Sequence, residues 1–220
     1  MVRGLWQCGW RREIVSGKEP YWDVGRPFSR VMTEPQTSPS IDASPVAEDV
    51  FVLPASFTQQ RLGFLDQTSN GGPAYNVFAA FRLTGSLDAG ALEHAVQVVV
   101  DRHESLRTTF TETDGELMQV VTPNQTIQID RVDGAARGLT TEEALSAYLS
   151  AETAKPFDLQ RGPLLRVQLI ALTQTATVLL IVTHHTIVDG WSVQLLLDEL
   201  SETYAATLAR REPALPELPI

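Results

Sequence analysis

The 220-residue chain contains 43% apolar and 20% charged residues, a balance typical of a domain that folds around an apolar core. Its apolar runs are too short to cross a bilayer, and its net charge of −10 argues against a nucleic-acid-binding surface. We therefore expect neither a membrane nor a nucleic acid as a partner. A single cysteine, Cys8, excludes internal disulfides and a cysteine-rich zinc site, which makes a reducing cytoplasm the simplest location.

The beginning of the chain differs from the rest in composition. Residues 1–30 contain six Arg or Lys and three Asp or Glu, about +3, so the remainder carries −13 (−10 minus 3). Residues 33–49 are dense in Pro, Ser, Thr and acid without a periodic apolar pattern, which is typical of a flexible linker. We therefore expect an unassigned extension and linker over residues 1–45 and one folded domain over residues 46–220.

Helices and strands then alternate. A short helix is predicted from about Ser56, with Phe57, Leu62 and Leu65 available to the core. Residues 75–85 are predicted to form a strand, followed by a helix whose predicted N-cap is Asp88. The apolar stripe of that helix comprises Leu87, Ala91, Leu92, Ala95, Val96 and Val99.

The second half of the domain continues the mixture. An Asp114-Gly115 turn predicts a hairpin over residues 107–121, and a further strand is expected at 127–132. A helix capped by Thr140 or Thr141 should end before Pro156. The remaining elements are strands at 164–172 and 177–183 and a last helix from Ser192 to about Arg210. This order predicts an α+β sandwich with helices packed on a mixed, largely antiparallel sheet.

The most informative segment, "HHTIVDG", stands where a strand ends and the last helix begins. His184 and His185 should point to opposite faces because they are neighbours on a strand. The spacing leaves three interpretations open: a structural turn in which Asp189 or Ser192 caps the helix, a metal site, or a catalytic histidine oriented by Asp189. A metal site is disfavoured, since diverging histidines cannot converge on one ion.

Three motifs in order resemble the condensation domains of nonribosomal peptide synthetases. "SFTQQRLGFL" (56–65) matches the family's first motif except at Thr58 and Gly63, "RHESLRTTF" (102–110) matches the second throughout, and "HHTIVDG" (184–190) matches the third in full. The resemblance covers about residues 48–220, and its spacers are most similar to the subtype that joins two L-configured residues. It implies the N-terminal lobe of a fold with two lobes, each similar to chloramphenicol acetyltransferase.

The resemblance also implies a reaction and a site. The reaction is amide formation between a donor thioester and the α-amino group of an acceptor, both held on phosphopantetheine arms of carrier proteins, with no directly bound cofactor or metal. His185 would be the catalytic residue. His184, Asp189, Gly190 and Arg61 would be structural, with Arg61 pairing with Asp189 to fasten the loop to the first helix.

The second motif is expected to be structural too, with Glu104 and Arg107 making internal ion pairs. The family's second lobe is absent from this sequence, so a missing lobe or neighbouring synthetase modules are further expected partners, and apolar surface should be exposed. Two alternatives stay open: a carrier-recognition lobe without turnover or a gene fragment, and a free-standing acyltransferase of the same superfamily that uses coenzyme A.

Overall fold

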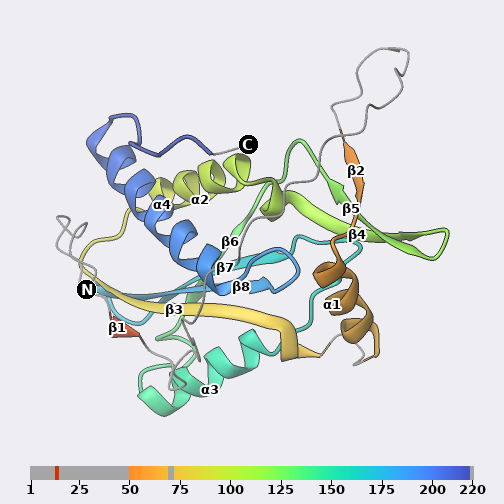
Figure 1. The fold of residues 1–220 in the computed structure, drawn as a ribbon. Coiled ribbons are helices and arrows are strands. Elements are labelled where there is room, and N and C mark those ends of the chain that lie inside the picture. The colour runs from red at the N-terminus through yellow and green to blue at the C-terminus, as the bar shows by residue number, and fades with distance from the viewer. Residues whose placement is uncertain (1–12, 15–49, 69–71, 219–220) are drawn as a thin grey trace, which may run out of the picture.

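The computed structural model describes residues 13–14, 50–68 and 72–218 of the chain. Figure 1 shows the resulting arrangement: a larger sheet lies between two layers of helices, and a smaller sheet with one helix lies to its side. This is the α+β architecture that the sequence predicts. The predicted boundary near residue 46 lies outside the described residues.

The larger sheet has five strands in the order β1-β3-β8-β7-β6. All neighbouring pairs are antiparallel except β6 and β7, so the sheet is mixed and largely antiparallel as predicted. Most positions of β7 and β8 are buried, because helices cover both faces of the sheet. The strands are β1 (Glu13–Ile14), β3 (Asn76–Thr84), β6 (Ile129–Asp133), β7 (Leu165–Ala171) and β8 (Ala176–His184).

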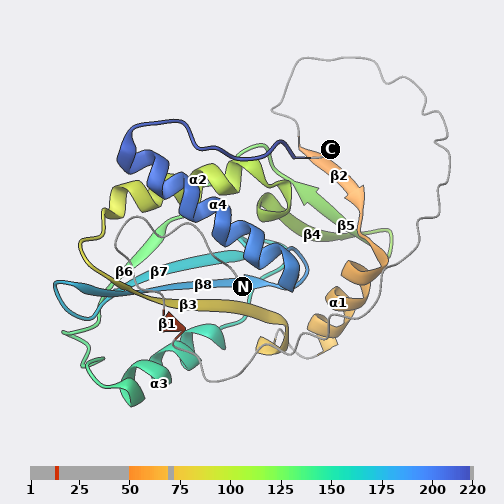
Figure 2. The same ribbon diagram turned by 60° about the vertical axis from the view of Figure 1, so that its left-hand side comes forward.

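Helices α2 (Ala89–Arg102) and α4 (Gly190–Ala209) lie side by side on one face, and α3 (Glu142–Thr153) covers the other (Figure 2). The predicted caps are confirmed. The Asp88 carboxylate accepts from the Ala91 N–H at 2.9 Å, and the Thr141 hydroxyl accepts from the Ala144 N–H at 3.2 Å.

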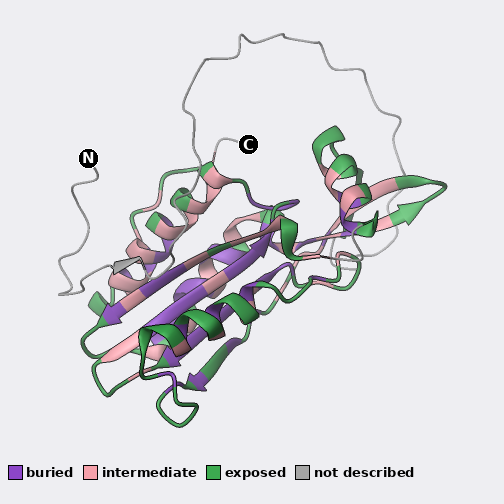
Figure 3. Cartoon of the chain, turned by 90° about the horizontal axis from the view of Figure 1, so that it is seen from below, coloured by how far each residue is buried: buried purple, intermediate pink, exposed green. Residues whose placement is uncertain are grey.

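The smaller sheet has the order β2-β5-β4, with β2 (Phe51–Pro54), β4 (Thr108–Thr113) and β5 (Glu116–Val121). Its hairpin turns as predicted, because Asp114 and Gly115 adopt φ values of 54° and 82°, the paired positive angles of the favoured two-residue turn. The sequence pattern did not predict β2, in which every residue is exposed and no alternation is visible. Figure 3 shows that burial concentrates in the five-stranded sheet.

Helix α1 (Phe57–Thr68) packs beside this smaller sheet. It begins with a capping box: the Ser56 N–H donates to Gln59 Oε1 at 2.7 Å, and the Gln59 N–H donates to Ser56 Oγ at 3.3 Å. Leu62 and Leu65 are half-buried as expected, but the prediction of a core role for Phe57 is wrong, because its side chain is 84% exposed. Two 3₁₀ turns, η1 (Pro73–Tyr75) and η2 (Glu104–Arg107), complete the described elements.

Candidate active site at the end of strand β8

Strand β8 presents the two histidines in opposite directions. His184, its last residue, is buried with 1% of its surface exposed, whereas His185 is exposed. Their backbones bond to opposite neighbours: the His184 N–H donates to the Leu164 carbonyl at 3.1 Å, and the His185 N–H donates to the Tyr75 carbonyl at 2.8 Å. Every residue of 182–184 and 186–188 is buried, so His185 is the one position in this segment that can meet a substrate.

The contacts of His184 define its protonation. The backbone N–H of Thr186 donates to His184 Nδ1 at 3.3 Å, and the Thr186 hydroxyl lies 2.9 Å from the same atom. Because a backbone N–H can only donate, Nδ1 must be the unprotonated nitrogen and Nε2 carries the proton. Burial lowers the pKa of His184, although the nearby Asp66 carboxylate opposes that shift, so the ring is neutral near pH 7.

Asp189 is the N-cap of α4, as the structural-turn interpretation predicted. Its Oδ1 accepts from the Ser192 N–H at 2.8 Å and from the Ser192 hydroxyl at 2.7 Å. These hydrogen bonds hold the pKa of Asp189 below its usual value. Gly190 begins α4 without a positive φ, so the backbone conformation there does not itself require glycine.

The predicted ion pair between Arg61 and Asp189 is wrong: among the described residues Arg61 makes no ion pair, and its side chain is exposed. The reason is helical geometry. Gln59 and Gly63 of α1 face the protein, and a residue two positions away on a helix is rotated by about 200°, so Arg61 points to solvent.

Other side chains of α1 contact the histidine loop instead. Gln59 Nε2 donates to the Thr186 carbonyl at 3.3 Å, and Asp66 Oδ1 lies 3.6 Å from His184 Nε2, slightly longer than a hydrogen bond. Gln59 and Asp66 are seven residues apart, two helical turns, and therefore share one face. Asp66 was not predicted. The signal available in the sequence was its spacing: Asp66 follows Gln59 by seven residues, two helical turns, which places it on the same face of the predicted helix.

The second motif ties helices together without reaching the histidine loop. Glu199 of α4 is 3% exposed, and its Oε2 lies 2.6 Å from His103 Nε2 and 3.2 Å from Arg102 Nε. Arg107 binds backbone carbonyls of residues 100, 101, 122 and 123. The motif is structural as expected, but the predicted ion pairs of Glu104 and Arg107 are wrong, because neither residue has a carboxylate or cation partner within the described chain.

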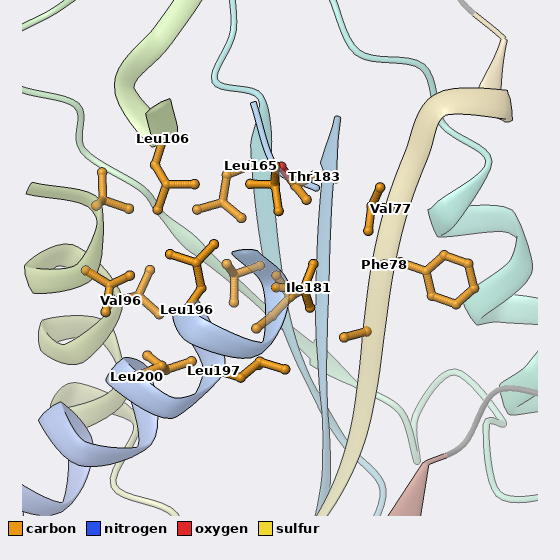
Figure 4. Close-up of a pocket in the computed structure, with 16 residues that line it drawn as sticks. Val77, Phe78, Val96, Leu106, Leu165, Ile181, Thr183, Leu196, Leu197 and Leu200 are labelled. Carbon is orange, nitrogen blue, oxygen red and sulfur yellow. The ribbon is translucent and has the colours of Figure 1, made fainter. Parts of the chain in front are cut away.

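Two cavities in the described part of the chain lie near the loop or near its α1 contact Asp66. One of about 60 Å³ lies between the sheet and helices α2 and α4 and is apolar except for Thr183. Figure 4 shows Leu196, Leu197 and Leu200 of α4 and Ile181 of β8 lining one space, with the Phe78 ring turned away on the far side of its strand. This cavity offers no titratable group, so it supplies no chemistry. The other, about 200 Å³, lies between α1, the β4–β5 hairpin and residues 157–160, and Asp66 and Glu112 line it.

The described residues contain no group of three or more His, Cys, Asp or Glu side chains able to hold a metal ion. Within the same residues, no helix combines the length and apolarity needed to span a membrane. Within the described residues, the histidine loop presents one exposed imidazole, that of His185, from a segment that is otherwise buried and hydrogen-bonded.

The fold is an α+β sandwich lobe of the chloramphenicol acetyltransferase type. The condensation-domain family model matches residues 51–219, and the chain belongs to that family, the condensation domains of nonribosomal peptide synthetases.

Sequence relatives are components of peptide synthetases. One of the linear gramicidin synthase proteins of Brevibacillus parabrevis is 44% identical over 182 residues, which are 82% of this chain and 2% of that protein. Phosphinothricin tripeptide synthetase PhsC of Streptomyces viridochromogenes is 36% identical over 192 residues, covering 87% of this chain and 18% of that protein. The chain therefore spans a small part of the curated relatives that it matches.

Solved structures show the same fold. The starter condensation domain of rhizomide synthetase RzmA superposes with a TM-score of 0.70 at 22% identity, covering 76% of this chain and 42% of that one. The X-domain in complex with OxyB from teicoplanin biosynthesis gives a TM-score of 0.68 at 30% identity, covering 84% and 38%. The chain matches about two fifths of each.

Proposed function

We propose that this chain supplies the histidine-bearing lobe of a condensation domain, which forms an amide bond between two carrier-bound substrates in the cytoplasm. The acceptor amine attacks the donor thioester carbonyl, the carbon–sulfur bond breaks, and the donor arm leaves as a thiol. The observation that carries the proposal is the exposure of His185 on a loop whose neighbours are all buried and hydrogen-bonded.

His185 is proposed to orient the amine and to move its proton to the departing sulfur. A positioned base typically contributes 10²–10⁴-fold, about 3–5 kcal/mol. An α-amino group has a pKa of about 7.7–8, so a useful fraction is already neutral near pH 7. Holding two tethered reactants in register contributes ~7–11 kcal/mol, which makes positioning the larger effect.

The supporting roles proposed for His184 and Asp189 rest on their contacts, and that of Gly190 rests on its place at the start of α4. His184 is neutral, buried and bonded to Thr186, while Asp189 caps the helix that starts at Gly190. The role proposed for Arg61 changes, since it faces solvent. It lies between two exposed aromatic rings of α1, Phe57 and Phe64, at spacings of four and three residues.

This outer face of α1 (Phe57, Arg61 and Phe64) is proposed as a carrier-protein docking surface. Exposed aromatic side chains beside an exposed guanidinium are the composition that protein interfaces favour. An otherwise acidic chain would repel an acidic carrier, and Arg61 supplies a local cation. Phe64→Glu is expected to weaken carrier binding at least tenfold, whereas Leu208→Glu, an exposed apolar control on α4, is expected to leave it unchanged.

The rest of a condensation domain is proposed as the second partner. Residues 50–53 are each about half exposed along edge strand β2, and Trp191 next to the histidine loop is 84% exposed. An apolar edge strand with unpaired backbone groups is a template for further pairing. Because the chain matches two fifths of the solved domains, we expect their remaining part to cover this surface.

Reconstitution tests the proposal. The 220-residue chain, alone and completed with the second part of the gramicidin synthase condensation domain, would be given loaded donor and acceptor carriers, and dipeptidyl thioester would be measured by mass spectrometry. Product from the completed domain supports the proposal, and product from the chain alone would show autonomous activity. Carrier binding without product in either form would instead support a recognition module.

A further inference from the structure

We propose that Asp66 is a positioning residue, which holds the imidazole of His184 in one tautomer and through it fixes the turn that presents His185. The expected effect of Asp66 on turnover rests on the proposed function, whereas its effect on the tautomer of His184 does not. It starts from the 3.6 Å approach between Asp66 Oδ1 and His184 Nε2, two groups 118 positions apart in the sequence (184 minus 66).

The environment of Asp66 makes this contact specific. Asp66 and Gly63 are the buried residues of α1, although an acid is costly to bury without a partner. Asp66 is the carboxylate that acts on His184, and its attraction opposes the effect of burial on that ring. The rings of Tyr75 and Phe157 lie edge-on to the imidazole, at 6.3 and 6.2 Å between centroids, and leave it little freedom to turn.

The tautomer connects Asp66 to the turn. A carboxylate facing Nε2 favours the proton on that nitrogen, which leaves Nδ1 free to accept from the N–H and hydroxyl of Thr186. If the proton moved to Nδ1, the Thr186 N–H would lose its acceptor in a buried site. The same turn carries the bond from the Ile187 N–H to the His184 carbonyl, so the backbone around His185 depends on the ring of His184.

Gln59 provides a second contact between α1 and the turn that carries His185. Its amide reaches the Thr186 carbonyl from the same face of α1 that carries Asp66. Helix α1 therefore contacts the third motif at the two ends of one turn, through Asp66 at His184 and through Gln59 at Thr186. Displacing α1 would disturb both contacts together, and a misplacement of about 1 Å at a reacting group can reduce turnover by about 10²-fold.

The test uses nitrogen-detected NMR of the imidazoles in the 220-residue chain, whose four histidines are few enough to assign. The wild-type chain should show His184 as the Nε2–H tautomer with slow exchange of that proton. Asp66→Ala should lose that protection and shift the His185 signals, and Asp66→Asn, whose amide oxygen can still accept, should restore both. Glu112→Gln removes a charge from the same cavity and should change neither.

In the completed domain, Asp66→Ala should lower kcat by about 10- to 100-fold and leave the acceptor KM within twofold. Observation of wild-type His184 protonated on Nδ1 would overturn the proposal. This measurement needs no variant, so the role of Asp66 can be tested even if the Asp66→Ala chain folds poorly. Unchanged His185 signals in a folded Asp66→Ala chain would also overturn it. If the completed wild-type domain makes no product, the proposed function fails while the NMR result still decides the role of Asp66.

Discussion

The buried carboxylate of Glu199 offers the sharpest stability test of the fold. Glu199 joins the middle of α4 to His103 and Arg102 at the end of α2. The side chain of Glu199 is 3% exposed, that of His103 12% and that of Arg102 21%. Arg102 also donates to the Pro216 carbonyl, so the segment after α4 depends on the same cluster. Removing one partner of a buried charge pair costs about 3–5 kcal/mol, because the other charge is left uncompensated.

We therefore expect Glu199→Ala to lower the free energy of unfolding by about 3–5 kcal/mol. With a urea m-value of about 2–3 kcal/mol/M, the midpoint should fall by about 1–2.5 M. Glu199→Gln keeps hydrogen-bonding capacity and should cost less. The matched control is Glu93→Ala on α2, which breaks the exposed pair with Arg131 and should cost less than about 1 kcal/mol. Equal midpoints for Glu199→Ala and Glu93→Ala would show that burial of the Glu199 cluster contributes nothing extra to stability.

Two further predictions concern the histidine loop. Burial lowers the pKa of His184 in the folded chain, whereas in the unfolded chain its pKa is about 6.5. Below about pH 6.5 the unfolded chain therefore binds a proton at His184 that the folded chain does not. The free energy of unfolding should fall as pH falls from about 6.5 toward the lowered pKa. The urea midpoint should change more between pH 7.5 and pH 5.5 for the wild type than for His184→Gln. An equal change in the two proteins would contradict a lowered pKa of His184. Asp189→Ala removes the cap of α4 and should cost about 1 kcal/mol, measurable by thermal unfolding, whereas Asp189→Asn should cost little; a loss equal in both variants would count against capping.

Local chemistry explains which predictions are confirmed. The caps at Asp88 and Thr141 and the Asp114-Gly115 turn depend on residues within four positions of one another, so the sequence alone could indicate them. The opposite directions of His184 and His185 follow from the pleat of any strand.

The errors arise where tertiary contacts decide. Phe57 is apolar yet exposed, because the inner face of α1 is the one that carries Gly63 and Asp66. Arg61 was paired with Asp189 through resemblance, but its position on the helix directs it outward. Glu104 lies nearer in sequence to Arg102 than Glu199 does, and only the packing of α4 on α2 shows which acid the motif uses.

The catalytic role of His185 is best tested by single-turnover amide formation in the completed domain with loaded carriers, compared between the wild type and His185→Ala. We predict a loss of about 10²–10⁴-fold in rate, with carrier binding unchanged. A His185→Ala domain that retains nearly all of its rate would contradict both the orienting and the proton-transfer roles of His185.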